Sequence, residues 1–205
     1  MLHYRYSIYE RGTNMSTTQP IRTKHQVREL VSYYLKKGEL RNHLLIVLGI
    51  HTALRVSDLL RLTWEDVYDF DRLRLRESVT VTEKKTRKTK TIALNPAILA
   101  ALRLCLNRAK PGGVLIESRK GQNRAISRIQ AYRIIRAAAE ALAFASRVSC
   151  HSLRKTFGYH LWKSGVSPAV IMEIYNHSSF AVTRRYLGVC QDDQNEAYCH
   201  LAAVL

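Results

Sequence analysis

Apolar residues recur at helical spacing along much of this chain, which predicts a succession of amphipathic helices. The first pattern starts at His25 and ends at Gly38, and a second, more apolar segment runs from about Leu40 to Thr52. Because the second segment is apolar on more than one side, we expect that helix to be buried on most of its faces. The first pattern is defined by Val27, Leu30, Val31, Tyr34 and Leu35.

Between Asp66 and Leu94 the apolar residues recur at every second position instead of at helical spacing. The alternating positions are Leu73 and Leu75, Val79 and Val81, and Ile92 and Leu94. This alternation predicts a small antiparallel sheet. Residues 83–90, with the sequence Glu-Lys-Lys-Thr-Arg-Lys-Thr-Lys, lie between the last two pairs and are expected to form a basic hairpin tip. Taken alone, such a charge run is most simply a solvated turn.

Prolines, glycines and capping serines mark further helices in the second half of the chain. Pro96 is expected to open one helix, and Ser127 is expected to cap another. The predicted ranges are 96–109, 127–143, 152–164 and 168–175. These patterns together predict a mainly α fold with a small antiparallel β-sheet, which belongs to the α+β class.

Length and composition favour one packed domain with a short segment at each end. The chain has 205 residues, of which 46% are hydrophobic, enough for a single core. We assign residues 1–24 to an arm or linker, within which Met15 is an alternative start, and residues 25–190 to the domain. Residues 191–205 form a tail with acidic side chains and no Lys or Arg, and we expect a tail helix there.

The charge of the chain points to a polyanionic partner. Lys and Arg outnumber Asp and Glu by 33 to 16, and the formal net charge is +17. This balance favours nucleic acid, although ribosomal and membrane-surface proteins share it. The longest strongly apolar run, Leu44–Ile50, is too short to span a bilayer, so we expect a cytoplasmic protein without membrane contacts. No metal site is expected, because the spacing of Cys105, Cys150, Cys190 and Cys199 fits none.

The candidate chemistry lies in a set of residues suited to attack on a phosphodiester without a metal. His151 and Arg154 form an H-x-x-R motif, His177 follows, and Tyr186 comes nine positions later. Arginine suits the non-bridging phosphate oxygens because its planar group is permanently charged. Histidine and lysine suit proton transfer, and tyrosine is a nucleophile. Taken singly, each residue also has an ordinary structural explanation.

These ordered motifs resemble the catalytic domain of the tyrosine recombinases, the phage integrase superfamily. The resemblance spans about residues 27–189 and rests on Ala53–Leu62, His151–Phe157, Asn176–Ser179 and Thr183–Tyr186. It implies a site-specific recombinase that cuts and rejoins DNA through a 3′-phosphotyrosyl intermediate, in integration, excision or inversion, without a cofactor. The implied catalytic residues are Arg55, Lys85, His151, Arg154, His177 and the nucleophile Tyr186.

Basic residues around these motifs are the expected DNA contacts. They are Lys84, Arg87, Lys88, Lys90, Lys155 and Arg184. Lys84 and Lys88 remain alternatives to Lys85 as the catalytic hairpin lysine. The chain also departs from the family at Tyr175-Asn176, where Leu-Gly is common. Asn tolerates a left-handed backbone, so we expect the turn to survive.

The resemblance also implies partners. Besides double-stranded DNA, it implies a homotetramer on two DNA sites, with a carboxy-terminal segment passed between protomers, and accessory DNA-bending proteins. The acidic tail is the candidate for that segment, with Asp193 as a helix cap and an apolar stripe at Ala197, Tyr198, Leu201, Val204 and Leu205. Residues 1–24 are too few for the family's amino-terminal domain, which suggests a compact member similar to the fimbrial inversion recombinases.

Two other functions remain open on the sequence alone. One is a non-catalytic DNA-binding regulator or remnant integrase on the same fold, because the extra domain is missing and Tyr175-Asn176 differs. The other is a type IB topoisomerase, which shares the chemistry, although the small size and the candidate exchange tail disfavour it. A binder alone has no need of the tyrosine, which favours the recombinase.

Overall fold

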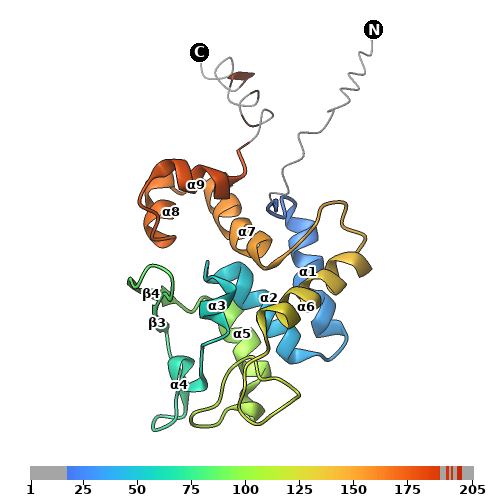
Figure 1. Ribbon diagram of the computed structural model, residues 1–205, viewed down its shortest axis with the longest axis vertical. Helices are drawn as coiled ribbons and strands as arrows, with labels where there is room; N and C mark the ends of the chain where they lie inside the picture. The colour runs from blue at the N-terminus through green and yellow to red at the C-terminus, as the bar shows by residue number, and fades with distance from the viewer. Residues whose placement is uncertain (1–17, 190–192, 194, 196–197, 200–205) are drawn as a thin grey trace.

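The computed structural model describes residues 18–189 together with Asp193, Asn195, Tyr198 and Cys199. Helices dominate, as Figure 1 shows. The helices are α1 Lys24–Lys36, α2 Leu40–His51, α3 Val56–Leu59, α4 Trp64–Val67, α5 Pro96–Leu104, the 3₁₀ turn η1 Leu106–Arg108, α6 Arg128–Ala141, α7 Cys150–Lys163, α8 Pro168–Ile174 and α9 Phe180–Leu187. The strands are β1 Tyr68–Asp69, β2 Arg74–Leu75, β3 Ser78–Thr82 and β4 Thr89–Ala93.

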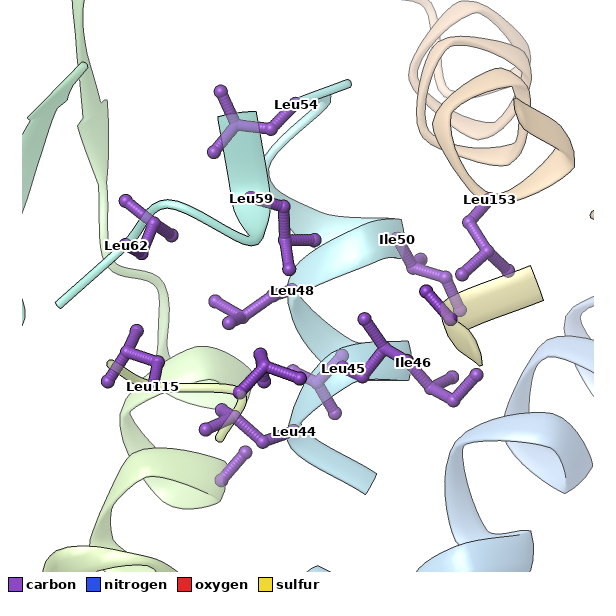
Figure 2. Packing of buried hydrophobic residues seen from close by; sticks show 14 of the residues in the cluster. Leu44, Leu45, Ile46, Leu48, Ile50, Leu54, Leu59, Leu62, Leu115 and Leu153 are labelled. Carbon is purple, nitrogen blue, oxygen red and sulfur yellow. The ribbon is translucent and has the colours of Figure 1, made fainter. Parts of the chain in front are cut away.

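Helix α2 is the centre of the main core, as its apolar sequence predicted. Every residue from Asn42 to Ile50 is buried. Figure 2 shows its leucines and isoleucines packed against apolar side chains from other segments, among them Leu59, Leu115 and Leu153. Gly49 lets α7 approach α2 closely, because a Cβ at that position would lie 2.6 Å from Leu153 Cδ1. The helix that carries the H-x-x-R motif therefore rests directly on the core.

The strands form two separate antiparallel pairs rather than the one small sheet that the alternation predicted. β1 pairs with β2, and β3 pairs with β4. Leu73 does not enter a strand, since it lies 74% exposed in the intervening turn with a φ of 51°. In the longer hairpin, Val79 opposes Ile92 and Val81 opposes Lys90. The register therefore places the Lys90 side chain on the same face as the two buried valines.

Most helix boundaries agree with the sequence, and the differences are local. The predicted helix 96–109 ends at Leu104 and continues as the turn η1. Helix α7 starts at Cys150, two residues before the predicted Ser152, because the Ser149 hydroxyl accepts hydrogen bonds from the backbone N–H groups of the first turn. Helices α3, α4 and α9 were not predicted. They have four, four and eight residues, too few for a clear period.

The described end of the predicted amino-terminal arm packs against the carboxy-terminal half of the chain. Pro20 and Ile21 are buried. The Ile21 N–H donates to Thr156 Oγ1 at 2.9 Å, and the Ile21 carbonyl lies 3.0 Å from His160 Nε2. Arg22 donates to the Gly188 carbonyl at 2.9 Å, just beyond α9. Residues 20–22 thus bridge α7 and the end of α9.

Only four residues of the predicted tail helix can be described. Asp193, Asn195, Tyr198 and Cys199 are helical. Asp193 Oδ1 pairs with Lys163 Nζ of α7 at 2.8 Å, and Tyr198 is 77% exposed. Ala197, Leu201, Val204 and Leu205 lie outside the described residues, so the predicted apolar stripe stays a prediction. In the part of the chain that the structure describes, no helix has the length and apolarity needed to cross a membrane.

Candidate active site

Five of the six predicted catalytic residues come together between the α2–α3 connection and helices α7 to α9. Arg55 caps the start of α3, His151 and Arg154 lie at the start of α7, and Tyr186 lies near the end of α9. His177 follows α8. Figure 1 shows α7, α8 and α9 grouped together, with the β3–β4 hairpin beside the same part of the molecule.

Tyr186 lies between the two histidines and the second arginine. The centre of its ring is 5.0 Å from that of His151 and 4.7 Å from that of His177. The Arg154 guanidinium carbon lies 5.6 Å from the same ring centre. Three residues apart on α7, His151 and Arg154 share one helix face, which explains the spacing of the motif. The ordered sequence motifs therefore correspond to one spatial cluster.

Arg154 is 1% exposed and is held by backbone oxygens, two aromatic rings and one carboxylate. It donates to the carbonyl of Ala53 and, at 3.2 Å, to that of Tyr175. Its guanidinium carbon lies 4.6 Å from the centre of the Tyr175 ring. Burial and then the nearby Arg55 charge lower the pKa of Arg154, although an arginine stays charged. The Arg154 guanidinium is therefore a positive charge whose position and orientation are fixed by these neighbours.

Glu83 is a site residue that the sequence reasoning missed. Its side chain is fully buried, and Oε2 accepts from Arg55 at 2.7 Å and from the Thr86 hydroxyl at 2.8 Å. Oε1 lies 3.3 Å from Lys90 Nζ and 3.7 Å from an Arg154 nitrogen. Burial alone would raise the pKa of Glu83, but Thr86, Lys90 and Arg55 outweigh it and lower the pKa to about 2. The carboxylate is charged at neutral pH.

The hairpin lysines divide into exposed and buried positions. Lys84, Lys85 and Lys88 are exposed in the β3–β4 turn. Lys85, the predicted proton donor, is therefore not among the clustered side chains. Lys90, predicted only as a DNA contact, is the lysine whose side chain reaches the cluster. It pairs with Glu83 and donates to the Ile174 carbonyl at 3.0 Å.

Of the other predicted DNA contacts, Lys155 and Arg184 lie beside the site and Arg87 lies in the hairpin turn. Arg87 is exposed in the hairpin turn with a φ of 58°, and Arg184 is exposed on α9. Lys155 is 7% exposed, and its burial lowers the pKa of its ammonium. A cavity of about 660 Å³ has Lys155 and Arg184 in its wall together with His151, Arg22, Arg185 and Tyr186. Positive side chains thus line the cavity beside Tyr186, the predicted nucleophile.

Both histidines are neutral at neutral pH. Burial is the main cause that lowers the pKa of each to about 4, and the charges of Arg154 and Arg55 add to it. For His151 the Lys155 charge contributes as well. His177 Nδ1 lies 3.0 Å from the Thr183 hydroxyl, which fixes the orientation of the ring. A neutral imidazole beside Tyr186 can accept its proton.

The departure at Tyr175-Asn176 is accommodated by the fold. Asn176 has a φ of 55°, so the left-handed turn is kept, as the sequence interpretation expected. Tyr175 is fully buried, stacks on His177 at 5.0 Å and donates its hydroxyl to the Arg154 carbonyl at 2.6 Å. Gly158 makes room for it, because a Cβ there would clash with the Tyr175 hydroxyl oxygen. Among residues 18–189 and the described tail positions, no group of three or more His, Cys, Asp or Glu gathers as in a metal site.

Comparison with known proteins gives one consistent family. The model of the phage integrase family matches residues 21–192. "Probable integrase/recombinase YoeC" of Bacillus subtilis (strain 168) is 37% identical over 184 residues, which cover 90% of this chain and 97% of YoeC. "Tyrosine recombinase XerA" of Pyrococcus furiosus is 28% identical over 85% of this chain, but the match covers only 59% of XerA.

Solved structures share the fold at low identity. The crystal structure of XerA recombinase superposes with a TM-score of 0.70 at 21% identity, covering 89% of this chain and 66% of that one. The XerH site-specific recombinase, bound to palindromic difH substrate in a post-cleavage complex, gives a TM-score of 0.72 at 19% identity, covering 91% and 53%. The mainly α fold with small antiparallel sheets is therefore confirmed.

Proposed function

Since the chain belongs to the phage integrase family, we propose that it cuts and rejoins DNA through a covalent link to Tyr186. It is a tyrosine-type site-specific recombinase, as its motifs predicted. The observation that carries this assignment of the nucleophile is the position of Tyr186 between two neutral histidines, with Arg154 beside it. That arrangement offers a nucleophile, a proton acceptor and a fixed positive charge at one place.

The proposed reaction exchanges one phosphoester for another. The Tyr186 oxygen attacks phosphorus, His151 takes the tyrosine proton, and a 3′-phosphotyrosyl bond forms as the bond to the 5′-oxygen breaks. Arg55, Arg154 and His177 stabilise the charge on the non-bridging oxygens. A hairpin lysine returns a proton to the leaving oxygen, and attack by the 5′-hydroxyl of a partner strand reverses the steps.

Lys85 remains the proposed proton donor, with Lys84 and Lys88 as alternatives. All three are exposed in the β3–β4 turn, where a bound duplex can meet them. Lys90 already pairs with Glu83 and donates a hydrogen bond to the Ile174 carbonyl, so its ammonium has two partners within the protein. DNA would bind across the basic cavity, held mainly through phosphates by Lys155, Arg184, Arg87 and the exposed hairpin lysines.

The proposed assembly is a homotetramer on two duplexes, used in integration, excision or inversion with accessory DNA-bending proteins, in the cytoplasm. Support comes from the family and from the charge of +17. The domain division proposed from the sequence is kept, with the catalytic domain at residues 25–190 and an exchangeable tail at 191–205. Residues 20–22, within the predicted arm, contribute packing to that domain.

Covalent capture tests the proposal. The protein is incubated with fragments of its source genome, quenched in denaturant, and the DNA that stays attached is sequenced. We expect adducts at one or a few inverted-repeat sites, and their loss to background in Tyr186→Phe, because phenylalanine has no oxygen to form the ester. Tyr132→Phe, which removes a hydroxyl on α6, is the matched control and keeps the adducts.

Absence of adducts despite salt-sensitive binding would contradict the proposal. It would favour the DNA-binding regulator, provided that addition of a cell extract as a source of accessory proteins also yields none. Relaxation of supercoils without any preferred site would instead favour a topoisomerase.

A further inference from the structure

A buried carboxylate shares the positive groups that the proposed reaction needs for phosphate. Glu83 comes from the β3–β4 hairpin, Arg55 from the connection after α2, and Arg154 from α7. The Glu83 side chain is 0% exposed and lies within 4.0 Å of both arginines and of Lys90. One side chain therefore ties three separate segments of the site together.

The charges at this point do not balance. Within this set of ion pairs Glu83 is negative, whereas Arg55, Arg154 and Lys90 are positive, so the four paired groups carry two net positive charges. Buried charges of one sign are costly unless a counter-charge lies close by. A phosphodiester carries one negative charge, so a scissile phosphate would still find a net positive site with Glu83 in place.

The hydrogen bonds are incomplete in the same region. Arg154 Nε is buried without a hydrogen-bond partner among the described residues, although the two terminal nitrogens of that guanidinium donate to carbonyls. Glu83 Oε1 likewise has no hydrogen bond within the described chain, and only ion pairs reach it. Unpaired buried groups of this kind are rare in folded proteins. A phosphate oxygen can accept from the Arg154 Nε–H, whereas Glu83 Oε1 is itself an acceptor and has only the neighbouring cations as partners. Phosphate and carboxylate oxygens accept from guanidinium donors in the same way.

We propose that Glu83 is the resident counter-anion of the phosphate site, which holds Arg55 and Arg154 in place and screens their charges until the scissile phosphate binds. Glu83 is thus a positioning residue rather than a catalytic one. This inference rests on the proposed phosphate contacts of the two arginines. Without the carboxylate, the three cations repel one another, and the arginines become more available to any anion.

The salt dependence of DNA binding tests the proposal, because each phosphate neutralised by a cation steepens the fall of affinity with salt. The probe is a 30-base-pair duplex of arbitrary sequence, and Kd is measured from low to moderate salt. We expect Glu83→Gln to steepen the slope of log K against log salt by about one, since one more cation is free to meet phosphate. Glu77→Gln removes the same charge from an exposed position before β3 and leaves the slope unchanged.

A second readout uses sulfate alone. The melting temperature of Glu83→Gln should rise more steeply with added sulfate than that of the wild type, because the anion replaces the missing carboxylate. If Glu83→Gln folds poorly, the comparison is made in Lys90→Met, which removes one of the three cations and so relieves the excess charge. Glu83→Gln/Lys90→Met should show a steeper salt slope than Lys90→Met.

The variant Arg55→Met tests the proposed phosphate contact independently of the role of Glu83. A flatter salt slope in Arg55→Met supports the phosphate contact, and an unchanged slope would overturn that contact. If Arg55→Met flattens the slope while Glu83→Gln and Glu77→Gln behave alike in both readouts, the counter-anion role is wrong and the phosphate contact stands.

Discussion

At the residue scale, the two histidines beside Tyr186 link the active site to the stability of the fold. Each has its pKa lowered from 6.5 to about 4, chiefly by burial. In the unfolded chain the same rings take up protons near pH 6.5. The stability that depends on the neutral rings is therefore complete above about pH 6.5 and is lost as the pH falls from there through 4.

We accordingly expect the melting temperature to fall between pH 7 and pH 5, and calorimetry or circular dichroism at fixed ionic strength will measure it. The double variant His151→Gln/His177→Gln should show a smaller fall over that interval. His25→Gln, which changes a histidine on the surface of α1, should keep the wild-type dependence. Equal falls in all three proteins would mean that the active-site histidines are not the groups responsible.

Individual site residues differ in how far the sequence could reveal them. Arg55, His151, Arg154, His177 and Tyr186 stand in ordered motifs. The structure brings the last four into contact around the Tyr186 ring and joins Arg55 to Arg154 through Glu83. Glu83 could not be found in this way, because it meets Arg55 across 28 positions and no local pattern marks a buried carboxylate. Lys90 differs from Glu83 in this respect. In a hairpin that pairs Val79 with Ile92, Lys90 pairs with Val81, so its side chain lies on the same face as the two valines.

At the scale of elements, the turn between α8 and α9 determines where His177 and Tyr186 lie. Asn176 takes a left-handed conformation with a φ of 55°, and its Nδ2 atom has no hydrogen-bond partner among the described residues. The residue therefore contributes mainly through its backbone. Such a conformation costs most other residues about 1–2 kcal/mol.

Substitution at this turn gives a direct test. Asn176→Ala should lower the free energy of unfolding by about 1 kcal/mol, whereas Asn176→Gly should leave it nearly unchanged, because glycine adopts positive φ without strain. Urea denaturation of the two variants measures both values. A similar loss in the glycine variant would show that the asparagine side chain itself stabilises the turn.

The elements that sequence patterns predicted well are long and have strong end signals. Helix α2 has an apolar run, and α6 has the predicted Ser127 cap. Helix α9 has only eight residues, and some of its apolar side chains, such as Phe180 and Val182, are exposed. Its sequence therefore lacks the single apolar face by which a helix is recognised. The two hairpins were merged in the prediction because alternation gives the period of a strand but not its partner.

At the scale of the whole molecule, the described chain has two hydrophobic cores of very different size. The main core surrounds α2 (Figure 2). It also includes side chains from α1, α5, α6 and the strands. The small core consists of Ala53, Ile171, Tyr175 and Leu187, with partly buried neighbours that include Tyr186. Because the free energy of local opening follows buried apolar contacts, α8 and α9 should open more readily than α2.

Hydrogen exchange followed by mass spectrometry will test this difference. Backbone amides of residues 181–187 in α9 should exchange at least about tenfold faster than those of residues 44–50 in α2 under native conditions. The amides of α7 should be intermediate, because Leu153 belongs to the main core and Phe157 packs on the small one. Uniform protection across the three helices would indicate a single cooperative unit.

The stability of the small core also bears on the fraction of molecules in which Tyr186 is in its reactive position. If α9 opens independently, the cleavage rate scales with the fraction of molecules in which Tyr186 is docked between its histidines. Leu187 is buried in the small core and is the residue next to Tyr186 in the chain. A substitution at Leu187 then changes the turnover rate by changing the fraction of molecules in which Tyr186 is docked. The rate of the chemical step in each docked molecule stays the same.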